Sequence, residues 1–142
     1  MAEISHRKAR TIIQKTLARG REMELKPLSI IVLDAGGHVK AFERDDGASP
    51  GRFDIARGKA YGAIMLGMGG QAQMARAEAQ HYFMTAMNGA FGGQVVPVPG
   101  GILVKTAKGE IVGAIGVTGD TSDNDEAAGV AGIEAAGLVA AP

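Results

Sequence analysis

The chain has 142 residues, 46% of them hydrophobic, which is enough for one globular domain over residues 1–142 with a sizeable core. Its 15 basic and 15 acidic residues give a formal net charge of zero, so the composition provides no basic surface for a phosphate backbone or an anionic membrane. We therefore expect neither a nucleic-acid partner nor a membrane partner.

Cysteine is absent from the sequence, and this excludes disulfides, thiolate nucleophiles and thiolate metal sites. Any metal would be held by His, Asp or Glu. Residues 1–25 are charged throughout and lack the apolar core of a signal peptide, and no stretch has the apolar length of a membrane span. We expect a cytoplasmic protein.

The start of the chain predicts a helix followed by a hairpin. Between Ser5 and Met23, apolar residues recur at helical spacing, and Ser5 has a side chain suited to an N-cap. The run LSIIVLD at 28–34 and the stretch at 39–44 have strand length, and a glycine turn separates them. These two strands should pair in an antiparallel hairpin.

The middle of the chain predicts two helices between loops. Residues 45–53 have the Asp, Gly, Ser and Pro content of a surface loop, and Asp54 is then placed to cap a helix that runs to Met68. A second helix is predicted over residues 71–89, and the glycine- and proline-rich segment 89–101 predicts a loop over the surface or over a pocket. The first of these helices should bury one apolar face, made of Ile55, Ala56, Ala60, Ala63 and Ile64.

The end of the chain predicts a second hairpin and a last helix. Strands are expected at 102–106 and 110–119. The last helix should have its N-cap within residues 120–123, with Asp125 and Glu126 in the first turn, and continue through 126–138. The resulting order, αββααββα, is typical of an α/β (α+β) fold in which helices pack on antiparallel strands. Side chains alternate between the two sides of a strand, so we expect one set on the last predicted strand to face the core. This set is either Val112, Ala114 and Gly116 or their neighbours.

Gly113, Gly116 and Gly119 recur through the last predicted strand and the turn after it. Such glycines can let a phosphate approach a helix N-terminus, but the sequence lacks GK[ST], and the acids of the turn would repel phosphate. We therefore interpret these glycines as residues of close packing between strands or subunits.

The acids before the last helix allow two interpretations. Asp123 and Glu126 form a DxxE pattern that, with Asp120 and Asp125, offers oxygen ligands to a hard cation. Acidic residues are also favoured at the start of a helix, because they cap it and complement its dipole. The spacing of these acids fits no complete calcium-binding loop. We favour capping and keep a metal site at Asp123 and Glu126 as the minority hypothesis.

The three histidines differ in their surroundings. His6 begins the first helix, where we expect it to be solvated, and His38 follows a glycine turn, where it should project from a hairpin edge toward a ligand. His81 lies in the second predicted helix among Met and aromatic residues, which would suit one axial contact and an apolar wall for haem or another flat ring. An exposed histidine above an ordinary Met-filled core is the alternative that we favour.

Charged residues crowd the region from Arg44 to Lys59. As an ordinary surface they would form solvated ion pairs of little energetic value. As a site, Arg44 or Arg57 would supply a guanidinium for a ligand carboxylate, with Lys59 or Tyr61 as a further donor.

Three separated motifs resemble the GlcG/HbpS-like family, which is also found at the C-terminus of PduO-type cobalamin adenosyltransferases. They are VLDAGGHVKAFERDDGASPGRFDIARGKAYGA at 32–63, the pair Gly100 and Gly101, and GEIVGAIGVTGDTSDNDEAA at 109–128. The resemblance covers nearly the whole chain in order. It implies an antiparallel sheet of about five strands packed by helices, in subunits that form homo-oligomers.

The resemblance also implies haem, because members are associated with haem binding, and some with haem degradation, iron binding or redox sensing. Haem ligation in relatives is attributed partly to a histidine in the first helix. The middle of that helix reads QKTLARGRE here and has no histidine. This leaves His38 and His81 as candidates argued from their surroundings.

Two functions stay open from the sequence, besides a purely structural oligomer. One is a cofactor-independent enzyme of a catabolic pathway that acts on a carboxylate-bearing metabolite, with His81 or Asp54 as acid or base. The other is a protein that binds haem or a related flat or acidic metabolite. Its candidate ligand contacts are His38, His81, Arg44, Arg57, Lys59, Tyr61, Gly100 and Gly101.

Overall fold

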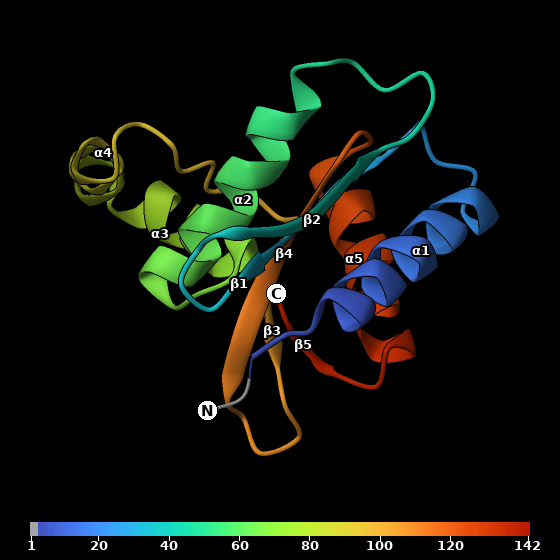
Figure 1. Cartoon of the computed structure of the whole chain (residues 1–142). Helices are drawn as coiled ribbons and strands as arrows, with labels where there is room; N and C mark the ends of the chain where they lie inside the picture. The colour runs from blue at the N-terminus through green and yellow to red at the C-terminus, as the bar shows by residue number, and fades with distance from the viewer. Residues whose placement is uncertain (1–2) are drawn as a thin grey trace.

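The computed structural model describes residues 3–142 as five helices and one five-stranded sheet (Figure 1). The predicted α/β (α+β) fold with an antiparallel sheet is confirmed. In chain order the elements are α1 (His6–Glu22), β1 (Ser29–Asp34), β2 (Val39–Arg44), α2 (Arg52–Leu66), α3 (Gly70–Ala79), α4 (His81–Ala90), β3 (Gly101–Lys105), β4 (Ile111–Thr118), α5 (Ser122–Ala135) and β5 (Val139–Ala141).

The sheet has the strand order β2-β1-β4-β3-β5, and each neighbouring pair is antiparallel. Both predicted hairpins are present, and they join through β1 and β4, where Ile31 lies opposite Gly116. The short edge strand β5 was not predicted. Its three residues are too few to show an alternating pattern, and they are placed by pairing with β3.

Helices cover both faces of the sheet. α1 and α5 lie side by side on one face, and α2 lies on the other, with α3 and α4 farther out (Figure 1). The strands β1, β3 and β4 are therefore buried on both faces. A single core-facing set on β4 is wrong: Val112 packs with the cluster under α1 and α5, whereas Ala114 packs with the cluster under α2. The strand pairing shifts register between Val104 and Lys105, and this bulge changes the alternation.

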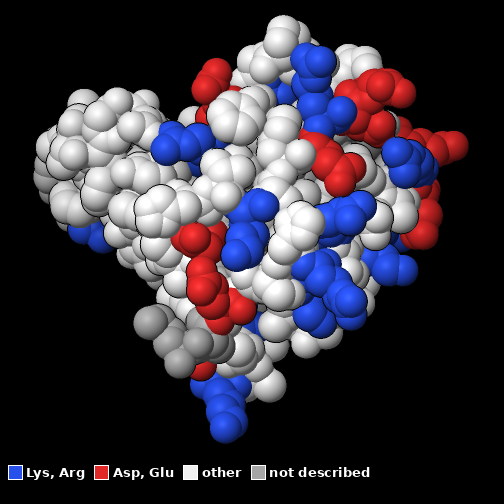
Figure 2. Space-filling view, in the orientation of Figure 1, with Lys and Arg blue, Asp and Glu red and all other residues white. Residues whose placement is uncertain are grey.

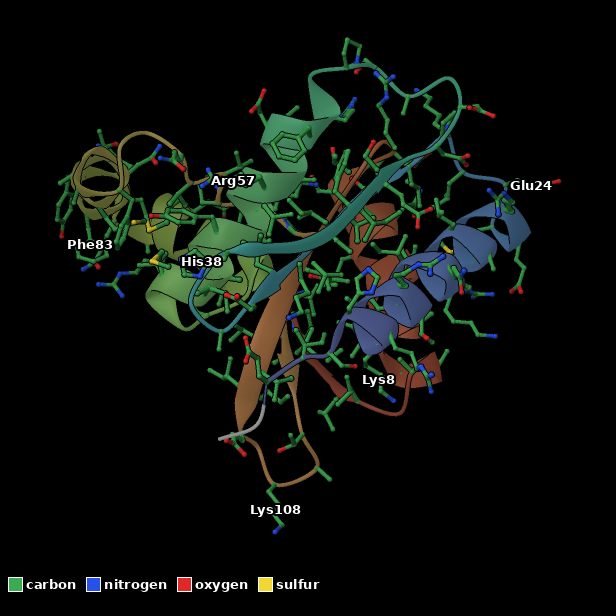
Figure 3. All side chains as sticks on the ribbon, in the orientation of Figure 1. Lys8, Glu24, His38, Arg57, Phe83 and Lys108 are labelled. Carbon is green, nitrogen blue, oxygen red and sulfur yellow. The ribbon has the colours of Figure 1, made fainter. Side chains whose placement is uncertain are left out.

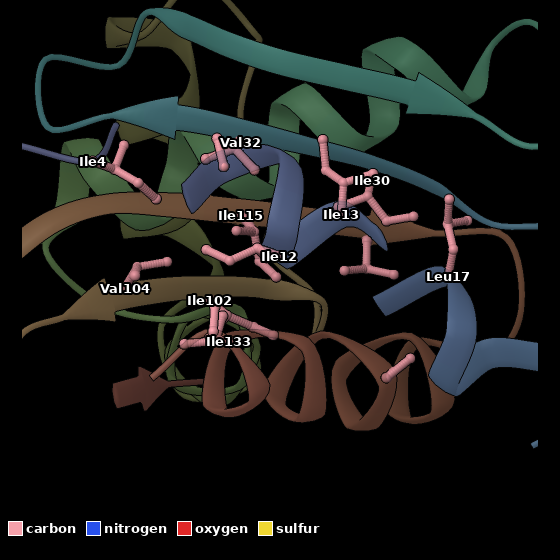
Figure 4. Packing of buried hydrophobic residues seen from close by; sticks show 14 of the residues in the cluster. Ile4, Ile12, Ile13, Leu17, Ile30, Val32, Ile102, Val104, Ile115 and Ile133 are labelled. Carbon is pink, nitrogen blue, oxygen red and sulfur yellow. The ribbon is translucent and has the colours of Figure 1, made fainter. Parts of the chain in front are cut away.

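The α1/α5 face holds a dense aliphatic core (Figure 4). α1 forms because its apolar residues face this core, and the Ser5 hydroxyl accepts a hydrogen bond from Lys8 N at 3.1 Å, as expected of an N-cap. Each fully buried isoleucine contributes about 1.5–3 kcal/mol of transfer free energy. The large buried side chains of this face are Ile12, Ile13, Ile30, Ile102, Ile115 and Ile133.

On the opposite face, α2 lies almost directly on the backbone of the sheet. A Cβ atom at Gly116 would lie 1.9 Å from the carbonyl oxygen of Ala56, and one at Gly101 would lie 2.4 Å from that of Lys59. No side chain fits at these two positions. Gly116 is thus a residue of close packing, but its partner is the backbone of α2 and not a neighbouring strand or subunit, as we had expected.

Two helix boundaries differ from the predictions. α2 begins at Arg52 with Gly51 at the N-cap, so Asp54 lies in its first turn, where a carboxylate still complements the helix dipole. The predicted helix over 71–89 is two helices, because the chain turns at Gln80 with φ −141° and ψ 63°. The last helix begins at Ser122 with Thr121 as its N-cap, so the prediction of an N-cap within residues 120–123 is confirmed.

Candidate functional site

The least charged part of the surface lies over α3 and α4. Between Glu78 and Lys105 the sequence has no Asp, Glu, Lys or Arg. Figure 2 shows this region as an almost white lobe, whereas charged side chains gather over the rest of the face in view. Two aromatic rings are exposed there, Tyr82 by 64% and Phe83 by 39%. An uncharged surface with exposed rings is typical of a region that binds another molecule.

An open hollow of about 300 Å³, the His81 hollow, lies between α3, α4 and the segment after α4. This volume is at the lower end of the range for small-molecule pockets. Its floor is a small cluster of Met84, Met87 and Val95, each at most 8% exposed. His81 stands among uncharged residues in the lining, which consists of Ala77, His81, Met84, Thr85, Met87, Asn88, Gly89, Val95 and Pro97.

The corner between α3 and α4 positions His81. Gln80 N donates to Arg76 O at 2.7 Å and closes α3, while Gln80 O accepts from Phe83 N at 3.0 Å and starts α4. The Arg76 side chain fixes the corner, because Nε donates to Gln80 Oε1 at 2.6 Å and the guanidinium lies 4.4 Å from the centre of the Phe83 ring. His81 is therefore the first residue of α4, with its ring 6.0 Å from that of Tyr82.

A second hollow of about 310 Å³, the Arg57 hollow, opens beside the first turn of α2. It brings together two residues that the sequence singled out, Asp54 and Arg57. Ile55 also lines it, so this side chain does not share the sheet-facing side of α2 with Ala56, as we had expected. The full lining consists of Asp54, Ile55, Arg57, Gly93, Gln94 and Val96.

Residues 93–97, the strap, form the wall between the two hollows. The strap is held to α4 by Val95 N, which donates to Asn88 Oδ1 at 2.8 Å. This agrees with the prediction of a loop over a pocket in this part of the chain. Successive side chains point in opposite directions, as in an extended chain, with Val95 and Pro97 in the His81 hollow and Gln94 and Val96 in the Arg57 hollow.

Lys59 lines neither hollow, because it is buried in an ion pair. Its Nζ donates to Val117 O at 2.8 Å and to Asp125 Oδ2 at 3.2 Å, and the two charged side chains are 3% and 1% exposed. Burial lowers the pKa of Lys59, and the Asp125 charge acts against this. A Cβ atom at Gly100 would lie 2.9 Å from Nζ. Gly100 and Gly101 thus leave space for Lys59 and its helix, and the ammonium already has partners.

Two other predicted ligand contacts lie outside both hollows. His38, at the β1–β2 turn, is on the same side of the molecule as Arg57 (Figure 3). Its side chain is 82% exposed, as expected for a hairpin edge, and Nδ1 lies 3.4 Å from Asp34 Oδ1. Arg44 is exposed at the end of β2. Neither residue adds to the linings that contain His81 and Arg57.

The acids before α5 act mainly in the turn and the cap. Thr121 is the N-cap, and its hydroxyl accepts from Asn124 N at 3.2 Å. The Asp120 carboxylate accepts from Asn124 Nδ2 at 2.8 Å, from Lys26 N at 3.0 Å and from Thr121 N at 2.8 Å, and these hydrogen bonds lower its pKa to about 2. Capping therefore accounts for this part of the acidic run.

Asp123 and Glu126 lie close enough that the Asp123 charge affects its neighbour. Burial, and then this charge, raises the pKa of Glu126. Within residues 3–142, no group of three or more His, Asp or Glu side chains is arranged to hold a metal ion. A metal site at Asp123 and Glu126 stays a hypothesis from the sequence.

The sequence did not single out the residues of the strap as part of a binding site, because they looked like part of an irregular loop. The strap can lie against α2 because that helix has two glycines one turn apart. A Cβ atom at Gly58 would lie 2.6 Å from Val96 Cγ2, and one at Gly62 would lie 2.8 Å from Val95 Cγ1. The GKAYG pattern at 58–62 and the long uncharged run after Glu78 were the available signals.

Comparison with known proteins identifies the fold group. A family model described as "Haem degrading protein HbpS-like" matches residues 4–134, so the resemblance seen in the motifs is confirmed. None of the curated protein sequences matches the chain significantly. Across residues 3–142, no helix has the length and apolar character needed to cross a membrane.

Solved structures share the fold over almost the whole chain. The PduOC:heme complex has a TM-score of 0.85 at 18% identity, covering 96% of this chain and 97% of that one. The Klebsiella pneumoniae protein ORFY has a TM-score of 0.83 at 22% identity, covering 96% and 92%. A double mutant of HbpS from Streptomyces reticuli has a TM-score of 0.79 at 25% identity, covering 94% and 87%.

Proposed function

The chain belongs to the HbpS-like family, and from this premise we propose that it binds a small molecule, haem, in the His81 hollow. The observation that carries the proposal is a single imidazole at an open hollow with an otherwise uncharged lining. One structure of the same fold is a haem complex. A homo-oligomer and a cytoplasmic location remain predictions.

The lining fits the chemistry of haem. When bound, haem would supply an iron centre that an imidazole can ligate. His81 would provide this ligand, and the corner at Gln80 holds it at the start of α4. Met84, Met87 and Val95 offer a floor that excludes water from the ring, since they are buried and uncharged.

The open side of the hollow suits the end of haem that carries its two carboxylates. A volume of about 300 Å³ accepts part of a large flat ring. The two carboxylates of haem would stay at the open side, in water, because the lining contains neither lysine nor arginine. The volume and the lining therefore support the proposal that only part of the ring would enter the hollow.

The competing location for haem is beside His6, the first residue of α1. His6 lies in a hollow of about 300 Å³ on the outer face of α1, with Arg7, Arg10, Thr11 and Gln14. This hollow has no apolar floor comparable to that of the His81 hollow. It therefore serves as the internal control for where haem binds.

The proposal is tested by titrating haem into the purified protein and following the Soret band. Wild type, His38→Ala and His6→Ala should give a saturable shift with similar affinity. His81→Ala should bind haem at least about tenfold more weakly, because an axial bond is lost. A nonspecific response in wild type, or an unchanged titration for His81→Ala, would contradict the proposal.

A cofactor-independent enzyme is less well supported. Asp54 and Arg57 share a hollow, so one predicted acid or base does lie beside a predicted carboxylate-binding arginine. His81, the other predicted acid or base, lines the other hollow, so the predicted catalytic residues do not meet in one place.

A further inference from the structure

The Arg57 hollow lies across the strap from the His81 hollow, and haem binding does not use it. Its volume, about 310 Å³, is also that of a small-ligand pocket. Unlike the His81 hollow, it contains two side chains of opposite charge, Asp54 and Arg57. The two hollows therefore select different chemistry.

Arg57 is held by contacts that leave most of its donors free. Its guanidinium carbon lies 5.2 Å from the centre of the Tyr61 ring, and Nη1 donates to Gln94 Oε1. Tyr61 is itself held edge to face against Phe91, with ring centres 6.2 Å apart. A guanidinium has five N–H donors, and no acid in the described part of the chain forms an ion pair with Arg57. A stacked arginine with free donors is suited to bidentate binding of a carboxylate.

Asp54 adds an acceptor to the same hollow. It precedes Arg57 by three residues, so both side chains lie on one side of α2. Among residues 3–142 neither has an ion-pair partner within 4.0 Å, so the two side chains do not form a salt bridge with each other. A carboxylate here would accept a hydrogen bond from a hydroxyl or an ammonium group of a ligand. It would also disfavour a second negative charge on that ligand.

We propose that the Arg57 hollow is a second binding site, for a small monocarboxylate with a hydroxyl or ammonium group next to the carboxylate. Arg57 binds the carboxylate, and Asp54 accepts the hydrogen bond from the neighbouring donor. Ile55 and Val96 contact the short carbon chain. Gln94 orients Arg57 from the strap, so a ligand in this site contacts the wall of the His81 hollow.

The site is tested by titrating ¹⁵N-labelled protein with lactate, alanine and propionate, which have the same number of carbon atoms. Lactate or alanine should give saturable shifts of the Arg57 Nε signal and of the strap amides. Propionate lacks the donor and should bind about tenfold more weakly. Preference for lactate would identify a hydroxy acid as the ligand class, and preference for alanine an amino acid.

Four variants assign the binding to this hollow. Arg57→Gln should lower the affinity for the preferred ligand by about tenfold or more. Arg57→Lys should lower it by less, because a point charge remains. Asp54→Ala should remove the preference over propionate. Arg44→Gln, which changes an exposed arginine outside the hollow, should bind as wild type does.

The two proposals can fail separately. His81→Ala should keep its affinity for the small carboxylate while it loses haem. Thermal unfolding of each variant shows whether its fold is intact. The absence of saturable shifts with all three ligands at millimolar concentration, or an unchanged affinity in folded Arg57→Gln and Arg57→Lys, would overturn the second site.

Discussion

The two helical layers of this molecule are built in different ways. Under α1 and α5 the sheet is covered by interlocking isoleucine and valine side chains. Under α2 it is covered by alanines and by glycines that admit the helix backbone. The first layer provides a closed core. The second brings α2 so close that α3, α4 and the strap pack outside it, and both candidate binding hollows form among them.

The largest expected effect comes from disrupting the buried ion pair that joins the two layers, between Lys59 on α2 and Asp125 on α5. Lys59→Met leaves Asp125 charged and buried, and it should lower the free energy of unfolding by about 3–5 kcal/mol. Denaturation in urea measures the loss.

The matched control combines Lys59→Met with Asp125→Asn. The amide removes the buried charge and keeps an acceptor for Asp120 N, which donates to Asp125 Oδ1 at 2.9 Å. This double variant should regain a large part of the lost stability. Equal losses for the single and double variants would show that the unpaired charge is not the cause.

A pair of truncations compares the closed core with the open hollow. Ile12→Ala on the α1/α5 face should cost about 2–5 kcal/mol, because it leaves a cavity in a core that is 0% exposed at this residue. Met84→Ala should cost less than half as much, because Met84 is buried in a much smaller cluster, with Met87 and Val95, beside an open hollow. Comparable losses would mean that α4 is part of the main core.

A pair of glycine substitutions tests the close approach of α2. Gly116→Ala places a Cβ atom 1.9 Å from Ala56 O and should destabilise the fold by about 1–3 kcal/mol. Gly89→Ala on α4 meets no atom within 4 Å and should stabilise it by up to about 1 kcal/mol. Thermal unfolding compares the two, and a neutral Gly116→Ala would refute close packing on this face.

The smallest expected effects are pH dependences with opposite signs at the β4–α5 turn. Hydrogen bonds from Asn124, Lys26 and Thr121 lower the pKa of Asp120 from 3.8 to about 2. The folded state thus binds this proton less tightly than the unfolded chain, and the stabilisation is present above about pH 4 and lost as the pH falls toward 2. Burial raises the pKa of Glu126, so its contribution favours the fold at low pH and declines as the pH rises.

Two neutral variants separate these contributions. Asp120→Asn should flatten the loss of stability on the acid side. Glu126→Gln should increase stability at neutral pH more than at acid pH. Urea midpoints measured across the pH range give both profiles, and profiles parallel to that of wild type would contradict the assignment.

The fold was largely predictable because its elements carry strong local patterns. The helical spacing from Ser5 to Met23 and the apolar runs of four strands gave α1 and both hairpins in the right places. The corner at Gln80 has neither glycine nor proline, and it depends on contacts with Arg76 and Phe83 that only the folded chain makes.

The site was predictable only where its residues are close in sequence. His81 stands near Met84 and Met87 along the chain, and these three share a hollow in the structure. Lys59 looked like a free ligand donor, because its partner Asp125 is 66 residues away. Patterns of nearby residues do not report such a tertiary pairing.

The most direct test of the account is amide chemical-shift mapping with gallium protoporphyrin, a diamagnetic analogue of haem. If the layer beyond α2 is the binding side, the shifts should cluster in residues 77–97, at the α3–α4 corner and along the strap, and be lost in His81→Ala. Shifts centred on His6 and the outer face of α1 would contradict that claim.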